Sequence, residues 1–368
     1  MRFSEITPHS FRNLSSDPVF LGSSLHVVAG ENGQGKTNLL EAIALLCGQR
    51  SFRGARPASC APDGEAFAVS GQLGGAGASE RLRIEWSAAE GRKFWRGEKS
   101  ISFRDVSRLA PAVFLAPEHR DLVAGPPEAR RRFLDRLVLG LEPAAGDDLA
   151  RYDRALSERN ALLSRGRHRA PAPGELETWT EEIVAAGTAV RRRRREALAQ
   201  WGRFFGPLAR EAGPEYAPLR AQYPAGETTL EGLRAECERL LPLERRRGHS
   251  LCGPHRDDLL WRRGERTFAA EASSGEAHRA VALAKLAEWH AVRRARGEPP
   301  LFGADDFDAG LSRESVEAFL SALPGEAQVI LTSASEPARW KGRAAVVLMR
   351  AGRALSSAPP APAAALGA

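Results

Sequence analysis

An eight-residue stretch near the start of the chain, GENGQGKT at positions 30–37, combines residue types that bind phosphate. The spacing is G-x-x-x-x-G-K-[ST], the P-loop pattern, in which glycines let the backbone turn tightly and aim successive N–H groups at a phosphate. Lys36 is expected at the β- and γ-phosphates, and the Thr37 hydroxyl at Mg²⁺. The predicted nucleotide-binding positions of the loop are Gly30, Glu31, Asn32, Gly33, Gln34, Gly35, Lys36 and Thr37.

The segments on either side of this loop predict how it is held. The run LHVVA before it is a short apolar strand candidate, and apolar residues recur at helical spacing after it, at Leu39, Leu40, Ile43 and Leu46. A strand, a glycine-rich loop and a helix N-terminus form an anion site, because backbone N–H groups and the helix dipole favour negative charge. The alternative is a chance glycine-rich turn, which is rare because the chain has only five lysines.

Two acids in the distal half predict the rest of such a site. Residues 301–307 read LFGADDF, an apolar run that ends in two carboxylates and is typical of a Walker B strand. Asp305 is expected to hold Mg²⁺, directly or through its waters, and Asp306 to polarise the attacking water. The alternative is an ordinary acidic loop after a weak strand, and Gly303 favours a weak strand.

A small polar cluster, Ser273-Ser274-Gly275-Glu276, opens an apolar-periodic helix within residues 269–290. It resembles the signature motif of ABC-type ATPases, in which the serine hydroxyl and the helix N-terminus meet the γ-phosphate of ATP held by another subunit. Ser273 then joins Lys36 and Asp306 as a predicted catalytic residue, while Gly275 and Glu276 bind nucleotide. The alternative is a plain helix cap, because Ser and Glu at this spacing are common capping residues.

A further strand candidate, residues 328–331, runs into Thr332 and Ser333. ABC-type ATPases carry a switch residue near the γ-phosphate after such a strand, and here it would be hydroxylic. The absence of the usual histidine argues against a rival interpretation, an ATPase subunit of a membrane transporter.

The composition is that of a soluble protein of about two domains. Of 368 residues, 43% are hydrophobic and 27% are charged. No apolar run approaches the length of a membrane span, and the N-terminus lacks the apolar region of a secretion signal. The four cysteines are scattered, which predicts reduced, mostly buried thiols in the cytoplasm and neither zinc ligands nor disulfides. They are Cys47, Cys60, Cys237 and Cys252.

The chain is basic, with a formal net charge of +7, and nearly all of its 53 basic residues are arginines. A GC-rich genome would explain the excess of arginine, but arginine also suits bidentate phosphate contacts, and a basic nucleotide-binding protein favours nucleic acid as a partner. Candidate DNA-contacting runs are 191–195, 130–132 and 245–247. The alternative for the first run is a solvated helix whose arginines pair with nearby acids.

Sequence character changes along the chain. Residues 1–116 mix short strand candidates with glycine-rich turns, residues 117–248 carry helical periodicity, and α/β character returns over 249–352. We therefore expect an α/β fold with a discontinuous head and an inserted helical arm, too short for a long coiled coil. The low-complexity tail, residues 353–368, is expected to be disordered.

Together these features resemble the RecF family of bacterial DNA-repair ATPases, relatives of the SMC and ABC ATPases. The resemblance covers nearly the whole chain. Its most discriminating stretch is LCGPHRDDL, because that block is not a general ATPase motif. The matching stretches are Phe11-Arg12-Asn13 and residues 30–43, 116–135, 151–163 and 251–259.

The resemblance implies an ABC-type P-loop ATPase head, ATP and Mg²⁺ as cofactors, slow hydrolysis, and an ATP-dependent homodimer that clamps gapped or double-stranded DNA. It also implies RecO and RecR as partners, with loading of the RecA recombinase downstream. Three departures touch the dimer-completed half of the site or its support: Gly303, Ser312 in place of the D-loop acid, and His278 in place of a basic residue. They leave open a partly degenerate, ATP-gated scaffold with little turnover.

Overall fold

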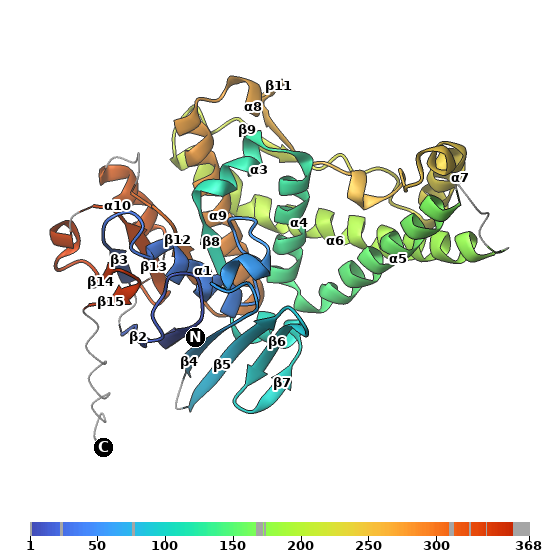
Figure 1. Cartoon of the computed structure of the whole chain (residues 1–368). Coiled ribbons are helices and arrows are strands. Elements are labelled where there is room, and N and C mark those ends of the chain that lie inside the picture. The colour runs from blue at the N-terminus through green and yellow to red at the C-terminus, as the bar shows by residue number, and fades with distance from the viewer. Residues whose placement is uncertain are drawn as a thin grey trace, which may run out of the picture. The chain divides into compact units, whose positions relative to one another are not determined.

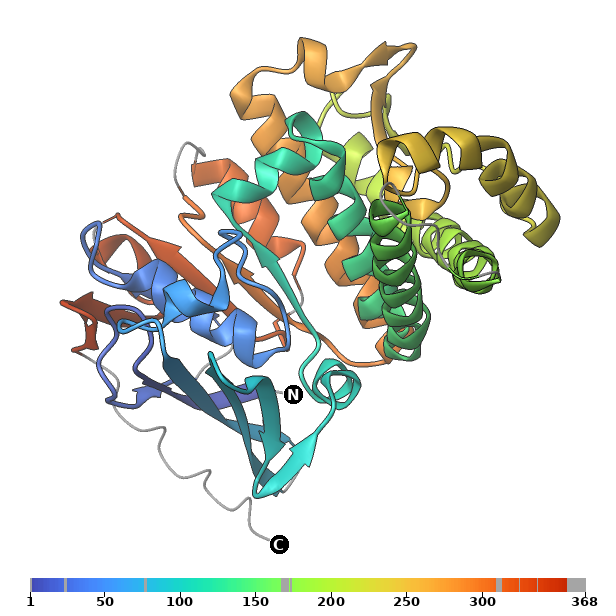
Figure 2. The ribbon, with the colours of Figure 1, turned by 45° about the vertical axis from the view of Figure 1, so that its right-hand side comes forward.

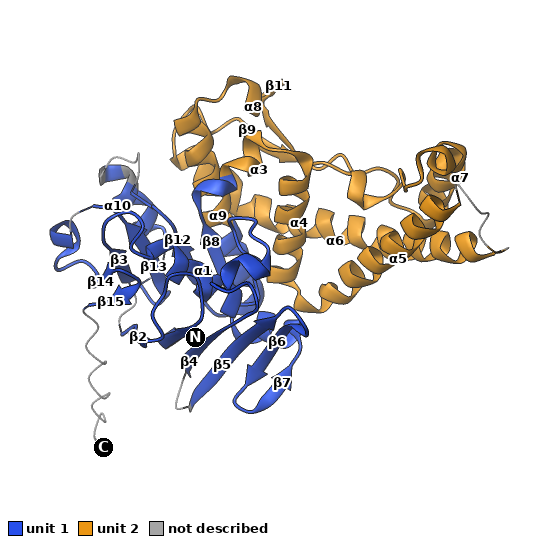
Figure 3. Cartoon of the chain, viewed as in Figure 1, with its two compact units in different colours: residues 1–119, 288–368 blue, residues 120–287 orange. Residues whose placement is uncertain are grey.

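The structure is a computed structural model that describes residues 2–22, 25–75, 78–166, 172, 174–308, 313–323, 325–335 and 337–355. The chain divides into two compact units (Figure 3). Unit 1 comprises residues 1–119 and 288–368, and unit 2 comprises residues 120–287. Within the described ranges, no helix is both long and apolar enough to cross a membrane.

Unit 1 contains two six-stranded sheets (Figure 1). The first is antiparallel, in the order β2-β1-β4-β5-β6-β7, and the second, in the order β15-β14-β3-β13-β12-β8, is parallel except where β15 joins. The first sheet has β1 Arg2–His9, β2 Val19–Phe20, β4 Ala66–Gly75, β5 Ala78–Ser87, β6 Gly91–Arg96 and β7 Lys99–Ile101. The second has β3 Leu25–Ala29, β8 Ala112–Leu115, β12 Leu301–Ala304, β13 Val329–Ser333, β14 Ala345–Arg350 and β15 Arg353–Ala354.

Helix α1 (Lys36–Leu46) joins these two sheets into one core. It contacts β4 and β5 of the first sheet and β12 and β13 of the second, so apolar residues are needed on most of its faces. Leu39 and Ile43 are fully buried. The predicted strand at 25–29 is confirmed as β3, which lies between β13 and β14 and therefore reads as a continuous apolar run. The glycine-rich loop consequently begins at the carboxyl end of a central parallel strand.

Unit 2 is mainly helical, as predicted for the arm (Figures 1 and 2). Helices α5 and α6 pack against each other, and α6 also contacts α4 and α7. The helices are α3 Asp121–Ala124, α4 Pro127–Leu141, α5 Gly146–Arg165, α6 Glu175–Glu211, α7 Leu230–Arg247, α8 Phe268–Glu271 and the first part of α9 Ser274–Arg296. A small sheet in the order β11-β10-β9 completes it, with β9 Leu219–Gln222, β10 Leu260–Arg263 and β11 Arg266–Thr267. Unit 1 adds helices α2 Phe103–Leu109 and α10 Arg313–Ser321.

The borders of the compact units differ from the predicted head and arm ranges. Residues 249–287, expected in the head, belong to unit 2. Part of the reason is that arginines of the helical segment bind the 254–258 block directly.

The expectation that the tail is disordered from residue 353 is wrong at its start, because β15 pairs with β14 and Leu355 N donates to Leu348 O at 2.7 Å. Residues 356–368 lie outside the described residues.

The expectation that no cysteines pair is wrong. Cys237 on α7 and Cys252 form a disulfide, with their Cα atoms 5.2 Å apart. The chain turns back after α7, which brings together two residues that the sequence separates by fifteen positions. Cys47 and Cys60 are free and buried, as expected, and burial raises the pKa of the Cys47 thiol.

Candidate nucleotide-binding site

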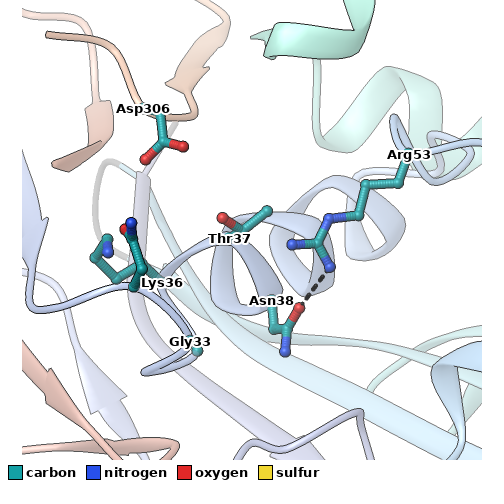
Figure 4. A pocket seen from close by; sticks show the side chains of 8 residues that line it. Gly33, Lys36, Thr37, Asn38, Arg53 and Asp306 are labelled. Atoms are coloured by element: carbon teal, nitrogen blue, oxygen red, sulfur yellow. Dashed lines mark hydrogen bonds between the residues drawn. The ribbon is translucent and has the colours of Figure 1, made fainter. Parts of the chain in front are cut away.

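One pocket of unit 1 is built from segments that are far apart in the sequence: the 30–37 loop with the start of α1, the segment after α1, and the turn after β12. Figure 4 shows Asp306 across from the start of α1 and the Arg53 side chain reaching toward Asn38. The pocket is lined by Asn32, Gly33, Gly35, Lys36, Thr37, Asn38, Arg53 and Asp306. The structure therefore brings together the loop and one of the two acids that sequence reasoning assigned to a single site.

The geometry of the loop follows from its glycines and from Gln34. Gly35 is the N-cap of α1 in the left-handed conformation, with φ of 100°, which glycine adopts without steric cost. Gln34 ties the loop to the β14–β15 turn: its Oε1 accepts from Ala351 N at 2.6 Å and its carbonyl accepts from Gly352 N at 3.0 Å. Gln34 is therefore a support of the loop and does not line the pocket.

Lys36 folds back across the loop. Its Nζ donates to Gly30 O at 2.8 Å and to Glu31 O at 2.9 Å, and the residue is only 4% exposed. An ammonium group has three donors, so these two bonds fix its position and leave one N–H for a ligand oxygen. Both acceptors are neutral carbonyls, so the positive charge is not neutralised by them.

The two acids after β12 are held by a single hydroxyl group. Thr332 Oγ1 donates to Asp305 Oδ1 at 2.6 Å and accepts from Asp306 N at 2.8 Å. Burial raises the pKa of Asp305, against the opposing effect of hydrogen bonds from Thr332 and Thr37. Asp306 has a φ of 45°, a strained conformation for a non-glycine residue that is typical of functional sites. The hydroxylic residue expected to act as a switch thus contacts the Asp305 carboxylate and the Asp306 backbone.

A third acid, Asp308, was not predicted. Its Oδ2 accepts from Ser333 Oγ at 2.8 Å, from Ser335 Oγ at 2.6 Å and from Arg339 Nη1 at 3.3 Å. The partners lie 25 to 31 positions away. The DDFD pattern was visible in the sequence, but nothing local distinguished the third acid from a loop residue.

Gly303, expected to weaken its strand, is instead required by packing. Strand β12 is paired on both sides, by β8 and β13. A Cβ at position 303 would lie 2.4 Å from Phe114 Cδ1 and 3.0 Å from Leu40 Cδ1. The glycine therefore allows a phenylalanine and helix α1 to approach the strand that carries the two acids.

A chain of side-chain hydrogen bonds, missed from the sequence, brings Arg53 to the pocket. Asn13 Nδ2 donates to Gly33 O at 3.1 Å, Asn38 Nδ2 donates to Asn13 Oδ1 at 2.7 Å, and Arg53 Nη1 donates to Asn38 Oδ1 at 2.8 Å. In the sequence, Asn13 stood out only as part of the Phe-Arg-Asn stretch of the family resemblance, which assigned it no role. Arg53 had no sequence signal.

The Ser273 cluster lies in unit 2 and forms a capping box at the start of α9. Ser273 Oγ accepts from Glu276 N at 3.2 Å, and Ser273 N donates to Glu276 Oε2 at 2.9 Å. The Ser273 backbone bond, with further bonds from Arg263 and the Ser273 hydroxyl, lowers the pKa of Glu276 to about 2. The capping interpretation is therefore confirmed. Ser273 and Gly275 are also exposed, and their contact with a triphosphate stays a prediction.

The sequence also departs from the family pattern at His278 and Ser312. His278 is half-buried, and burial lowers its pKa. Ser312 lies outside the described residues.

The five-arginine run on α6 is engaged within unit 2. Arg191 and Arg194 are buried, and each guanidinium donates from Nε and Nη2 to both oxygens of one carboxylate, Asp257 for Arg191 and Asp135 for Arg194. This agrees with the pairing alternative, although Arg192 and Arg195 remain exposed. Arg191 pairs with Asp257 and Glu236, and Arg192 pairs with Glu196. Arg193 pairs with Glu142 and Asp148, Arg194 pairs with Asp135, and Arg195 donates to the Thr228 hydroxyl.

The parallel sheet, the loop at the end of its central strand and the acids at the end of its neighbour define an ABC-type P-loop ATPase fold. No family model matches the sequence. Among solved structures, the chain is similar to one described as the recombination mediator protein RecF-ATP in the RecFOR pathway (TM-score 0.86, 24% identity, 97% of each chain). It is less similar to the Smc head domain from Pyrococcus furiosus (TM-score 0.50, 14% identity, 96% of this chain and 94% of that one).

Curated relatives give the family. The DNA replication and repair protein RecF of Anaeromyxobacter sp. (strain Fw109-5) is 33% identical over 346 residues, which cover 90% of this chain and 92% of that protein. RecF of Heliobacterium modesticaldum (strain ATCC 51547 / Ice1) is 32% identical over 96% of this chain and 98% of its own length. The chain belongs to the RecF family.

Proposed function

We propose that this protein binds ATP with Mg²⁺ in the pocket of unit 1 and uses it to control DNA binding in recombinational repair and replication-fork maintenance. The observation that carries the proposal is the meeting of the P-loop with the turn after β12 in one pocket. Family membership supports the biological part, because the curated relatives are named DNA replication and repair proteins and a solved relative is described as a recombination mediator bound to ATP.

The side chains have distinct roles in this proposal. The remaining Lys36 donor and the N–H groups at the start of α1 bind the β- and γ-phosphates. The Thr37 hydroxyl, which lines the pocket, and the buried Asp305 carboxylate are hard oxygen donors of the kind that suits Mg²⁺. A bound Mg²⁺ would neutralise charge on the phosphates. Asp306, which faces the same pocket, polarises the attacking water.

The ligand count of the pocket also fits Mg²⁺. Among the described residues, no group of three or more His, Cys, Asp and Glu side chains could hold a metal. Mg²⁺ is usually held by one or two protein carboxylates together with substrate phosphates and waters, not by an all-protein cage. One buried carboxylate next to a phosphate-binding loop matches that pattern.

The proposed clamp uses a second copy of the chain. Exposed Ser273 and Gly275, with the N-terminus of α9 that Glu276 helps to cap, bind the γ-phosphate held by the partner copy, so ATP stabilises the dimer. DNA affinity then depends on the nucleotide, because only the dimer presents two DNA-binding surfaces together. We further propose a cytoplasmic protein that works with RecO and RecR and assists loading of RecA.

The clamp can be tested by light scattering with ATP and gapped duplex DNA. Asp306→Asn should accumulate as a dimer, because hydrolysis that releases the partner is slowed. Ser273→Asp keeps a good N-cap but places a negative charge against the γ-phosphate, and should remain monomeric. Ser273→Thr keeps both the cap and the hydroxyl and is the matched control. Monomers of every variant, with and without ATP, would contradict the clamp.

Turnover separates an ATPase from a scaffold that only binds ATP. We expect the wild type to hydrolyse ATP slowly in the presence of DNA, and Lys36→Ala and Asp306→Asn to fall to background. Because packing requires Gly303, that position no longer argues for a degenerate site. Wild-type hydrolysis no faster than that of the two variants would remove the enzymatic part of the proposal.

A further inference from the structure

Unit 2 has a second pocket, formed where the start of α4 meets the 255–258 part of the GPHRDD block. Two arginines line it, Arg131 and Arg256, together with His255, Glu128 and Asp258. The pocket has no part in the nucleotide site described above. The resemblance marked this block as distinctive without assigning it a role.

The acids of this pocket are already engaged by other arginines. Asp258 accepts two bonds from Arg130, at 2.6 Å from Nε and 2.9 Å from Nη2. Glu128 is solvent-exposed and lies 4.0 Å from Arg132, one turn along α4. A bidentate pair neutralises the first carboxylate, and solvent screens the second.

The two arginines are not neutralised in this way. Arg256 is exposed, and its side chain makes no hydrogen bond or ion pair with any residue that the structure describes. Arg131 is half-buried, and its Nη1 donates to a neutral acceptor, Asp257 O, at 2.9 Å. Burial and then the neighbouring Arg194 lower the pKa of Arg131, Asp258 and Glu128 act in the opposite direction, and Arg256 adds to the lowering. The pocket therefore holds positive charge that an anion would stabilise.

The backbone that presents Arg256 is fixed from several sides. Arg194 Nη1 donates to Pro254 O at 2.8 Å, and Asp257 accepts from Arg191 Nη2 at 2.8 Å. Arg256 is thus the exposed side chain of a block whose other members are held in place. A donor on a fixed backbone loses only its side-chain entropy when it binds a ligand.

His255 belongs to this support and is not a ligand-binding group. Its Nε2 lies 3.1 Å from Ser250 O, which can only accept, so Nε2 carries the proton. Its Nδ1 therefore accepts from Tyr152 Oη at 2.6 Å. Burial lowers the pKa of His255 to about 4, which keeps the imidazole neutral near pH 7.

We propose that Arg131 and Arg256 form a second phosphate-binding site, which takes a phosphate of the DNA backbone or the phosphate of a free small molecule. Guanidinium groups suit this ligand because they present paired donors and stay charged. The DNA form of the proposal rests on the DNA-binding function proposed above. The small-molecule form does not.

The first test measures duplex binding by the full chain, by fluorescence anisotropy over a salt series. Arg256→Gln should weaken binding about tenfold and reduce the slope of log K against log salt by about one, as expected for loss of one phosphate contact. The matched control is Arg192→Gln, which removes the same charge from an exposed arginine that pairs with Glu196. It should bind within about twofold of the wild type with an unchanged slope. Thermal unfolding midpoints of both variants equal to that of the wild type would show that the fold is intact.

The second test identifies the source of the phosphate. Arg256 is labelled with phenylglyoxal and followed by mass spectrometry, with either duplex DNA or inorganic phosphate as the protecting probe. Protection by the duplex alone assigns a DNA-backbone site, and protection by inorganic phosphate as well assigns a site for small phosphates. If the wild type binds no duplex but inorganic phosphate protects Arg256, the DNA-binding proposal fails and the site stands. If both probes leave Arg256 unprotected and Arg256→Gln matches Arg192→Gln in affinity and slope, the site is overturned.

Discussion

The nucleotide pocket of unit 1 and the arginine network of unit 2 use charged residues in opposite ways. At the nucleotide site, Lys36 is held by backbone carbonyls and Asp305 by the Thr332 hydroxyl, which are neutral groups and leave both side chains without an oppositely charged partner. In the network, Arg191 and Arg194 bind carboxylates directly. Charges held by neutral groups stay available for binding, whereas charges that neutralise one another hold the fold together. The density of basic residues in a sequence does not distinguish the two.

The largest effect is expected from breaking the network at Arg191. The Arg191 and Asp257 side chains are only 2% and 4% exposed, so Arg191→Met leaves a buried carboxylate without its cation. Removing one partner of such a pair costs about 3–5 kcal/mol. Urea unfolding followed by tryptophan fluorescence measures this loss, since Trp201 and Trp261 are buried in unit 2.

The neighbouring residue gives the control for this experiment. Arg192 is exposed and pairs with Glu196 four positions along the helix, so Arg192→Met should change the free energy of unfolding by less than about 0.5 kcal/mol. Equal losses from the two substitutions would show that the network does not stabilise unit 2.

A smaller loss is expected where packing supports the nucleotide pocket. In Gly303→Ala the new methyl group would lie 2.4 Å from Phe114 Cδ1, an overpacking expected to cost about 1–3 kcal/mol. Gly325→Ala is the control, because nothing lies within 4 Å of the new methyl group there. Thermal unfolding of Gly303→Ala combined with Phe114→Leu should recover part of the loss. If Gly303→Ala unfolds like the wild type, the glycine is not required and the case for a degenerate site returns.

The sequence predicted those parts of the molecule whose signals are local. The P-loop, strand β3 and helix α1 follow one another within 22 residues, so spacing and periodicity were sufficient there. The acids after β12 were found because they directly follow an apolar run. Arg53 was missed because a relay through Asn38 and Asn13 brings it to the pocket, and the pairing of Arg191 was missed because Asp257 lies 66 positions away. Such contacts depend on tertiary structure and leave no periodic pattern.

Arg53 allows a test of whether charge at the pocket is free to bind ligand. Its side chain donates to Asn38 Oδ1, while its ion pair with Glu41 is long, at 3.8 Å. We expect Arg53→Gln to weaken binding of a fluorescent ATP analogue about tenfold, which corresponds to about 1.4 kcal/mol, with little change in the thermal midpoint. Arg56→Gln removes the same charge three residues away, outside the pocket, and should bind normally. Loss of stability without loss of affinity would assign Arg53 to the fold instead.

The smallest effect is expected at Glu276, where a charged residue has both a structural and a proposed binding role. Its folded-state pKa, about 2, lies below the ordinary 4.5, so its contribution to stability is complete above pH 4.5 and is lost as the pH falls toward 2. Glu276→Gln retains a residue that can complete the capping box but removes this titration. The wild type should therefore lose more stability than the variant between pH 4.5 and pH 2, as measured by acid unfolding of both proteins. At neutral pH, ATP-dependent dimerisation of the same variant separates the two roles of Glu276. Unchanged dimerisation would show that Glu276 acts only in the capping box. Altered dimerisation would show that its charge lies next to the triphosphate.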